Sequence, residues 1–458
     1  MVVPVESQLS EISPPRGRAR WRQWLPGAGL YLGAALEAYL FTWGRGVWGP
    51  LTRAMVFTAA SLLVVVAAFY YRPDLAPAAA RPPRLRGYLA SLVGVGAALI
   101  ATGQALVALF AQHAININYS DILPAIQVYC RRLLWGSPVY RELTHEMGYQ
   151  AYATYLPTTW LPFVVAEWFN FDYRWVALGG WLVGIVVGWM WLVRLQRPWP
   201  ETLLKALWPL ALIYSVAATD PSIFTLTAEA LIAGYVVLLA GALLTRSVVF
   251  GAVALTLCLL SRYFILIWVP LLAVLLLLET GWRRTVAFGL LVLALLIAGY
   301  FWPVWRHDPG LMLRVQSAYQ DIAVNEWLHL DAATGRPIHP FNGLGLAPAF
   351  FPDGVTDRPT LRAAADHLRR VQLGVIGAAL GAVALGWWRH RRRTGPNPAR
   401  ARWVAVVALK LFLVLFFALL HVPYAYMILV SVALTAFLVT LGPGGYAARS
   451  ALAARPDA

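Results

Sequence analysis

The stretch Phe224–Arg284 reads FTLTAEALIAGYVVLLAGALLTRSVVFGAVALTLCLLSRYFILIWVPLLAVLLLLETGWRR, and it decides the fold class. It holds three apolar runs, which start near Phe224, Val248 and Tyr263 and are separated only by short polar breaks. A helix needs about 20 mostly apolar residues to span a bilayer, and fewer can suffice when the helix is buried among others. The stretch therefore predicts consecutive membrane helices joined by very short loops.

The same pattern extends over most of the chain. Its 458 residues are 60% hydrophobic and only 13% charged, with a mean hydropathy of +0.63. A soluble domain is about 45–50% apolar, so lipid is the expected solvent. We predict an all-α polytopic integral membrane protein with about 12–13 hydrophobic segments by the length rule. They start near Leu25, Pro50, Leu89, Tyr155, Trp175, Leu203, Phe224, Val248, Tyr263, Val286, Val371, Trp403 and Pro423.

The positive charge of the chain lies mainly between the apolar runs. Lys and Arg number 37 against 21 Asp and Glu, a net charge of +16. In a soluble protein this excess would suggest nucleic acid, but between membrane helices it marks cytoplasmic loops. We therefore expect membrane lipids as partners, and no nucleic acid. The Ala-, Arg- and Leu-rich composition favours a bacterial cytoplasmic membrane.

The basic loops also predict the domain organisation. Residues 1–24 form a cytoplasmic N-terminus, 25–305 a transmembrane core that includes an extracytoplasmic loop at 112–154, and 306–370 a second long extracytoplasmic loop. Residues 371–445 form the C-terminal helices and 446–458 a tail. Membrane crossings counted forward from the N-terminus and backward from Arg283 differ by one between Tyr155 and Ala218. One segment there should therefore enter and leave on the same side, and a Pro-broken segment suits that role. Both Tyr155–Phe169 and Leu203–Ala218 fit that description.

Asp121 is the most informative residue of the first long loop. It follows a predicted helix exit, and the apolar residues Ile122, Ile126, Tyr129 and Leu133 after it have a helical period. This pattern predicts an amphipathic helix on the outer membrane face. Asp121 then has two interpretations: a functional carboxylate at a membrane-edge cavity, or an ordinary N-cap of that helix.

Around Asp121 the sequence resembles the first extracytoplasmic loop of GT-C superfamily glycosyltransferases. More narrowly, it is similar to the family-87 branch of polyprenol-phosphate-mannose-dependent mannosyltransferases. Residues that occupy the family pattern are Asp121, Tyr129, Gly136, Tyr140, Tyr155 and Pro157. The turn Thr219–Ser222 and the pair Ser261–Arg262 occupy two further positions of the family pattern. The residues there differ from those most common in the family. The resemblance extends roughly from Asp121 to Arg284.

This resemblance implies transfer of a sugar from a polyprenyl-phosphate-linked donor to a glycan, lipid or glycolipid acceptor on the outer face. Asp121 would be the general base. Arg262, Arg131 and Arg132 are candidates for contact with the donor phosphate, since fixed cations stabilise a phosphate leaving group. Tyr140, Tyr155 and His339 are further candidates for donor binding. The pattern calls for no cofactor and no metal.

Simpler explanations exist for each of these residues. The arginines can lie at the membrane interface, the tyrosines can belong to an aromatic belt, and a loop histidine can simply be solvated. Glu37 and Glu229 fall inside apolar runs, where acids often serve ion or proton paths. They support the main alternative, a transporter or flippase for lipid-linked glycans or other small solutes. A noncatalytic membrane subunit is a third possibility.

Overall fold

The computed structural model describes residues 16–442, apart from 45–46, 72, 74–84, 149–152, 196–197, 301–307, 309, 311–313, 315–320, 323, 333, 353 and 356. Several predicted features therefore lie outside the described residues. They are most of the N-terminal segment 1–24, the basic loop around Arg81, the first part of the loop 306–370, and the tail 446–458. Every named element in the described ranges is helical.

In the part of the chain that the structure describes, seven helices are long and apolar enough to cross a membrane. They are α2 (Pro50–Tyr70), α3 (Leu85–Gln112), α8 (Arg174–Arg194), α9 (Trp199–Thr219), α14 (Trp282–Leu296) with the π-helical turn that continues it to Tyr300, α17 (Arg358–Thr394) and α18 (Pro398–Ala418). Beside them stand α1 (Arg16–Thr42), the shorter apolar helices α11 (Glu229–Leu244), α12 (Val248–Leu259) and α13 (Val269–Thr280), and α19 (Leu429–Leu441), which follows η5 (Ala425–Ile428). The predicted all-α membrane protein is confirmed at this level.

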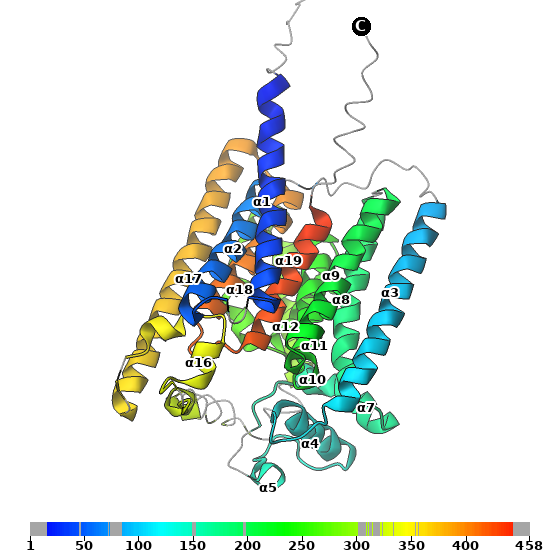
Figure 1. Ribbon diagram of the computed structural model, residues 1–458. Helices are drawn as coiled ribbons and strands as arrows, with labels where there is room; N and C mark the ends of the chain where they lie inside the picture. The colour runs from blue at the N-terminus through cyan, green and yellow to red at the C-terminus, as the bar shows by residue number, and fades with distance from the viewer. Residues whose placement is uncertain are drawn as a thin grey trace, which may run out of the picture.

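The helices form one bundle with two different ends (Figure 1). The described chain begins with α1 and finishes with α19 at the same end, here called the terminal end. The basic last turn of α17, with Arg391, Arg392 and Arg393, is also at this end. The short helices α4 (Ile122–Leu134), α5 (Thr144–Met147), α7 (Val164–Phe169), α10 (Ser222–Thr225) and α16 (Ile338–Asn342) gather at the opposite, loop end. The basic turns and the long loops are thus segregated.

Of the two segments that could be re-entrant, Tyr155–Phe169 is folded into short, interrupted helices. Residues Pro157–Phe169 form α6 (Pro157–Trp160), η1 (Leu161–Phe163) and α7, which contact α4 at the loop end. Pro162 lacks an N–H and interrupts regular helix geometry there. By contrast, α9 is continuous in spite of Pro209. The extra predicted crossing therefore belongs to Tyr155–Phe169.

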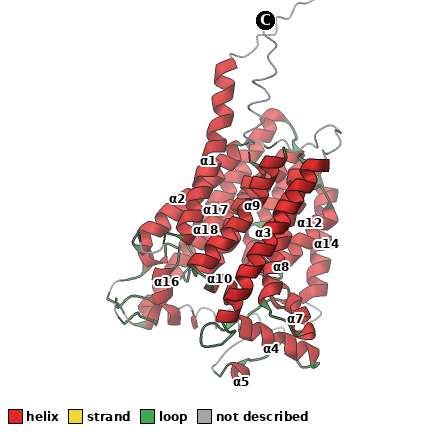
Figure 2. Ribbon diagram, turned by 45° about the vertical axis from the view of Figure 1, so that its right-hand side comes forward, coloured by secondary structure: helices red, strands yellow, loops and turns green. Residues whose placement is uncertain are grey.

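Small residues set the closest helix contact. A Cβ atom on Gly234 of α11 would lie 1.9 Å from the carbonyl oxygen of Gly180 on α8. No side chain fits at that distance, so the two backbones touch directly. Close approach through small residues is the usual means of packing between membrane helices, because lipid supplies no hydrophobic drive for their association. Figure 2 shows α3, α8 and α9 side by side, with α4, α5 and α7 beyond their loop end.

Arginine side chains satisfy carbonyl groups at helix ends. Arg53 donates to the carbonyl of Leu40 at 3.0 and 2.7 Å, and Arg174 donates to the carbonyl of Phe110 at 3.0 Å. The last four carbonyls of a helix have no partner within the helix, so a nearby cation both bonds and neutralises them. Arg174 begins α8 and bonds the end of α3, which ties together the two ends of the chain segment between these helices.

The second long loop ends earlier than its predicted boundary at residue 370. Helix α17 starts at Arg358, where the side chain of Asp357 accepts a hydrogen bond from the Thr360 backbone N–H at 3.0 Å. Asp is a strong N-cap residue, and Pro359 suits the first turn of a helix. The loop consequently contributes its last residues to a 37-residue helix that extends the bundle.

Candidate functional site

Asp121 immediately precedes α4 but does not cap it through its side chain. The capping function falls to Ser120, whose Oγ lies 3.3 Å from the Ile122 backbone nitrogen. Only the backbone carbonyl of Asp121 takes part in the helix, accepting from Ala125 N–H at 2.9 Å. Asp121 is exposed at the loop end. The simple capping explanation for this carboxylate is therefore not supported.

Ser120 also links the Asp121 segment to the turn before α11. Its hydroxyl donates to the carbonyl of Leu226 at 3.1 Å, across 106 residues of sequence. Leu226 follows the turn Thr219–Ser222 and α10, so this hydrogen bond connects the Asp121 segment with the chain just after that turn. The turn is itself internally bonded, because the Ser222 hydroxyl donates to the Asp220 carboxylate.

The pair Ser261–Arg262 is connected to neighbouring segments through two contacts. Arg262 forms an ion pair with Glu229, which begins α11 three residues after Leu226. In addition, the Thr159 hydroxyl donates to the Ser261 carbonyl at 3.0 Å, which connects α6 to this turn. The Glu229 side chain is 2% exposed and that of Arg262 is 20% exposed. Arg262 is thus held by a buried acid and does not simply extend to the interface.

Tyr140 and Tyr155 belong to an aromatic cluster with Tyr129 and Trp160. The ring of Tyr129 lies 5.9–6.1 Å from the other three rings, and Tyr129 is completely buried. Tyr140 Oη accepts from Trp160 Nε1 at 2.8 Å and donates to the Tyr155 carbonyl at 3.2 Å. Burial raises the pKa of Tyr129 and of Tyr140 above the ordinary value, so both hydroxyls stay protonated. The cluster holds α4 against the chain that leads into α6.

Arg131 and Arg132 lie in the last turn of α4. At 1.5 Å per residue they are about 15 Å along the helix axis from Asp121. Arg132 is 4% exposed and donates to three backbone carbonyls and to the carboxylate of Glu146. Arg131 pairs with Glu167 of α7 at 3.0 Å. These two arginines therefore organise the first long loop.

The pairing of Arg132 with Glu146 also affects ionisation. Burial by itself would raise the pKa of Glu146, but the hydrogen bond and charge of Arg132 hold that pKa below its ordinary value. The carboxylate is consequently ionised, and bonded to Arg132, at neutral pH.

His339 lies on α16, in another part of the loop end. Its Nε2 is 3.3 Å from Glu326 Oε2, and its ring packs 5.0 Å from that of Tyr424. Figure 1 places α16 and α4 over different helices of the bundle. The structure therefore links the Ser120–Asp121 segment to Leu226 and links Arg262 to Glu229, while it places His339 with a different set of residues.

Two hollows in the bundle are distinct from the Asp121 region. One is a groove of about 410 Å³ among α8, α9, α11 and α19, with Gly184, Lys205 and Pro209 in its lining. The other, of about 220 Å³, is lined by residues that include Phe57 and Ser431. Neither is lined by Asp121, so the cavity that we expect around this residue stays a prediction.

The partners of the site residues were not visible in the sequence. Glu229 attracts attention only as an acid within an apolar run, and Thr159 carries no motif at all. Comparison of the chain with protein-family models, with curated proteins and with solved structures finds no match. The interpretation of this site consequently depends on its residues alone.

Proposed function

We propose that this protein is a membrane glycosyltransferase that moves a sugar, with mannose as the first candidate, from a polyprenyl-phosphate-linked donor. The acceptor is a glycan, a lipid or a glycolipid. The observation that carries the proposal is the meeting of three segments that are distant in sequence. The hydrogen bond from Ser120 to Leu226 and the ion pair of Glu229 with Arg262 connect them at the loop end.

Asp121 is the general base of the proposed reaction. Its carboxylate takes the proton of the acceptor hydroxyl while that oxygen bonds to the anomeric carbon of the sugar. The bond between this carbon and the phosphate oxygen breaks, and the polyprenyl phosphate leaves with both electrons. Attack from the side opposite to the leaving group inverts the anomeric configuration. General-base catalysis of this kind contributes about 10²–10⁴-fold to a rate.

Arg262 stabilises the charge that develops on the departing phosphate. An arginine presents five N–H donors in a fixed plane, so pairing with Glu229 leaves it able to bond a second anion. The carboxylate fixes the direction of the guanidinium before the donor arrives. Preorganised donors of this type stabilise a transition state without reorganisation during the reaction.

We assign the loop end to the extracytoplasmic side of a bacterial cytoplasmic membrane. Support comes from the terminal end, where Arg391, Arg392 and Arg393 close α17. Short loops rich in Arg and Lys stay in the cytoplasm. Because Asp121 lies at the opposite end, its chemistry then faces outward.

The transporter alternative loses part of its support. It depends on acids within apolar runs, yet Glu229 pairs with Arg262, and Glu37 pairs with Lys410 at 2.6 Å. Acids in membrane helices usually pair with cations in this way, so an ion or proton path is not needed to account for these two acids.

Sugar transfer by the purified protein tests the proposal. The protein is reconstituted in nanodiscs with synthetic polyprenyl-phospho-mannose, or with the glucosyl analogue, and with short fluorescent oligosaccharide or glycolipid acceptors. Asp121→Asn should lower the transfer rate by about 10²–10⁴-fold, since an amide cannot accept the proton. Glu142→Gln is the matched control, because Glu142 is an exposed acid in the same loop that bonds Arg132 through its backbone carbonyl.

The outcomes separate the candidate functions. Transfer by Asp121→Asn at the wild-type rate would contradict the assignment of the base. No transfer with any donor, together with movement of a lipid-linked sugar between leaflets in proteoliposomes, would favour a flippase. Neither transfer nor movement would favour a noncatalytic subunit.

A further inference from the structure

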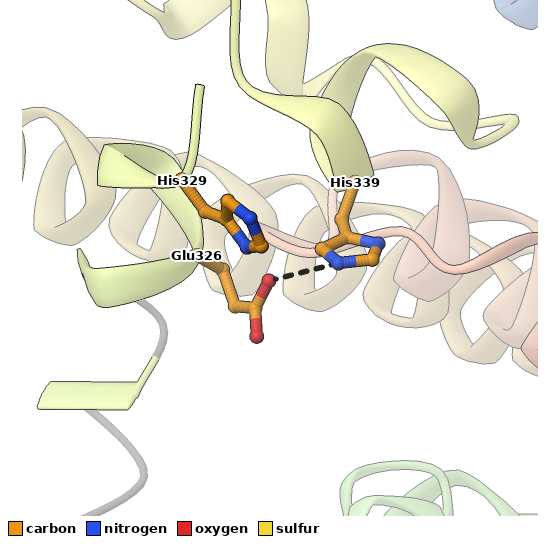
Figure 3. A group of neighbouring side chains, drawn as sticks. All are labelled: Glu326, His329 and His339. Atoms are coloured by element: carbon orange, nitrogen blue, oxygen red, sulfur yellow. Dashed lines mark ion pairs between the residues drawn. The ribbon is translucent and has the colours of Figure 1, made fainter. Parts of the chain in front are cut away.

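Three side chains of the second long loop form a group that is separate from the Asp121 region. Glu326, His329 and His339 each place one potential ligand atom within 4.8 Å of the others. Figure 3 shows both imidazole rings turned toward the carboxylate of Glu326. The distance from His339 Nε2 to Glu326 Oε2 is 3.3 Å, and the two rings are 6.0 Å apart. Sequence spacing did not single out this set, because His339 follows His329 only after a turn.

A hydrogen-bonded hairpin connects His329 to His339. A β-bridge joins Leu330 to Pro337, and the Ile338 N–H donates to the His329 carbonyl at 3.0 Å. Gly335 has a φ of +65° in the turn between them, a conformation that glycine adopts without strain. The hairpin returns the chain so that His339 stands beside His329.

The other side of the group is fixed to the bundle. Trp327 is completely buried, and its Nε1 donates to the His421 carbonyl at 2.7 Å. A Cβ atom on Gly343, just after α16, would lie 1.9 Å from the Pro423 carbonyl oxygen, so this segment fits closely against the loop before α19. Glu326 and His329 lie on one helical face and Trp327 points away from it, because residues three apart are neighbours on a helix. The three candidate ligands are thus presented by a supported scaffold.

The chemistry of the group fits a divalent transition metal ion. One carboxylate and two imidazoles are ordinary ligands of Zn²⁺, at bond lengths of about 2.0–2.2 Å. Tetrahedral bonds of that length place ligand atoms about 3.4 Å apart, which is close to the distance from Glu326 to His339. His329 is exposed, so rotation of its ring can bring its nitrogen to the same separation.

The surroundings of the Glu326 carboxylate also favour a bound cation. Its Oε2 is enclosed but has no hydrogen-bond partner, even with His339 nearby. An enclosed carboxylate oxygen that lacks a hydrogen bond is costly, and a coordinated cation removes that cost. A surface pair of His339 with Glu326 would not explain why His329 lies beside both of them.

We propose that Glu326, His329 and His339 bind one Zn²⁺ ion, with water in the remaining coordination position. The ion joins the helical turn before the hairpin to α16 and holds this part of the loop end in place. The proposal does not depend on sugar transfer, and its readout is metal binding.

Metal binding by the full-length, tag-free protein tests the site. After removal of metal with a chelator, the wild type should take up about one Zn²⁺ per chain in competition with a chromogenic chelator. It should also give the visible absorption of tetrahedral Co²⁺ when cobalt replaces zinc. Glu326→Gln, His329→Ala and His339→Ala should each weaken binding by at least about 100-fold, since loss of even a supporting residue costs 10–100-fold.

His367→Ala is the control, because His367 is an exposed histidine on α17 that lies outside the group. It should bind as the wild type does. Glu326→Gln preserves the shape of the side chain, so unfolding does not account for its loss of binding, and its helical circular dichroism should match the wild type. Absence of a bound ion in the wild type, or equal affinity in all variants, would overturn the proposal.

Discussion

Replacement of Lys410 by methionine should destabilise the bundle strongly. Lys410 and Glu37 are both 0% exposed, and they connect α18 to α1. Lys410 Nζ donates to Glu37 at 2.6 Å and to the carbonyl and hydroxyl of Ser431 at 3.0 and 2.7 Å. In Lys410→Met, Glu37 keeps only its hydrogen bond from the Thr435 hydroxyl at 2.7 Å.

The magnitude follows from the charge that is left behind. Removal of one partner of a buried ion pair costs about 3–5 kcal/mol, because the other charge stays buried without compensation. Removal of both, in Glu37→Leu/Lys410→Met, leaves no buried charge and is often nearly neutral. Thr435 can then turn to the Ser431 carbonyl, which is already 3.5 Å away. We therefore expect a coupling energy of at least about 2 kcal/mol between the two sites.

Equilibrium unfolding in bicelles, measured for the wild type, both single variants and the double variant, supplies the four free energies. The double variant should be more stable than Lys410→Met alone. A cost below about 1 kcal/mol for Lys410→Met would refute the reasoning, since polar contacts in membrane proteins can be that weak. Strictly additive effects of the two substitutions would refute it as well.

Three further predictions concern helix packing, pH and the proposed site. Gly234→Ala should cost about 1–3 kcal/mol in the same unfolding assay, because its Cβ would clash with a carbonyl of α8, whereas Gly374→Ala meets no atom within 4 Å and should be tolerated. The lowered pKa of Glu146 means that its bond to Arg132 stabilises the fold above the ordinary pKa of about 4.3 and is lost as pH falls through the lowered value. The protection of amides in residues 137–147, taken relative to the intrinsic exchange rate at each pH, should therefore fall only in acid for the wild type, and already at neutral pH for Glu146→Gln; equal protection of the two proteins at pH 7 would contradict this. Ser120→Ala removes the link to the turn before α11 and should cost about 1 kcal/mol while it lowers sugar transfer, and an unchanged rate would show that the link has no part in catalysis.

Local properties of the sequence were sufficient for the helical architecture. Apolar runs of spanning length predict helices in a bilayer, because only a helix satisfies all backbone hydrogen bonds within one segment. The period of Ile122, Ile126 and Tyr129 likewise predicted α4, which the structure has at Ile122–Leu134. The sequence also predicted that the arginine-rich turns and the long loops lie at opposite ends of the bundle, because Arg and Lys are concentrated in short cytoplasmic loops.

The tertiary structure decided which residues become partners. It broke Tyr155–Phe169 at the loop end and kept α9 continuous, a choice that composition left open because both segments contain proline. It paired Glu229 with Arg262 and placed His339 beside the neighbours Glu326 and His329, although nothing in the local sequence connects Glu229 to Arg262 or His339 to the other two.

These pairings depend on how helices cross and where the chain turns back, so they involve contacts between residues far apart in the chain. The sequence alone therefore determined that the chain forms membrane helices with a loop-rich end, because hydrophobicity and periodicity are local. The chemical neighbourhoods of Asp121 and His339 were decided only by folding, because their neighbours come from segments that are distant in the chain.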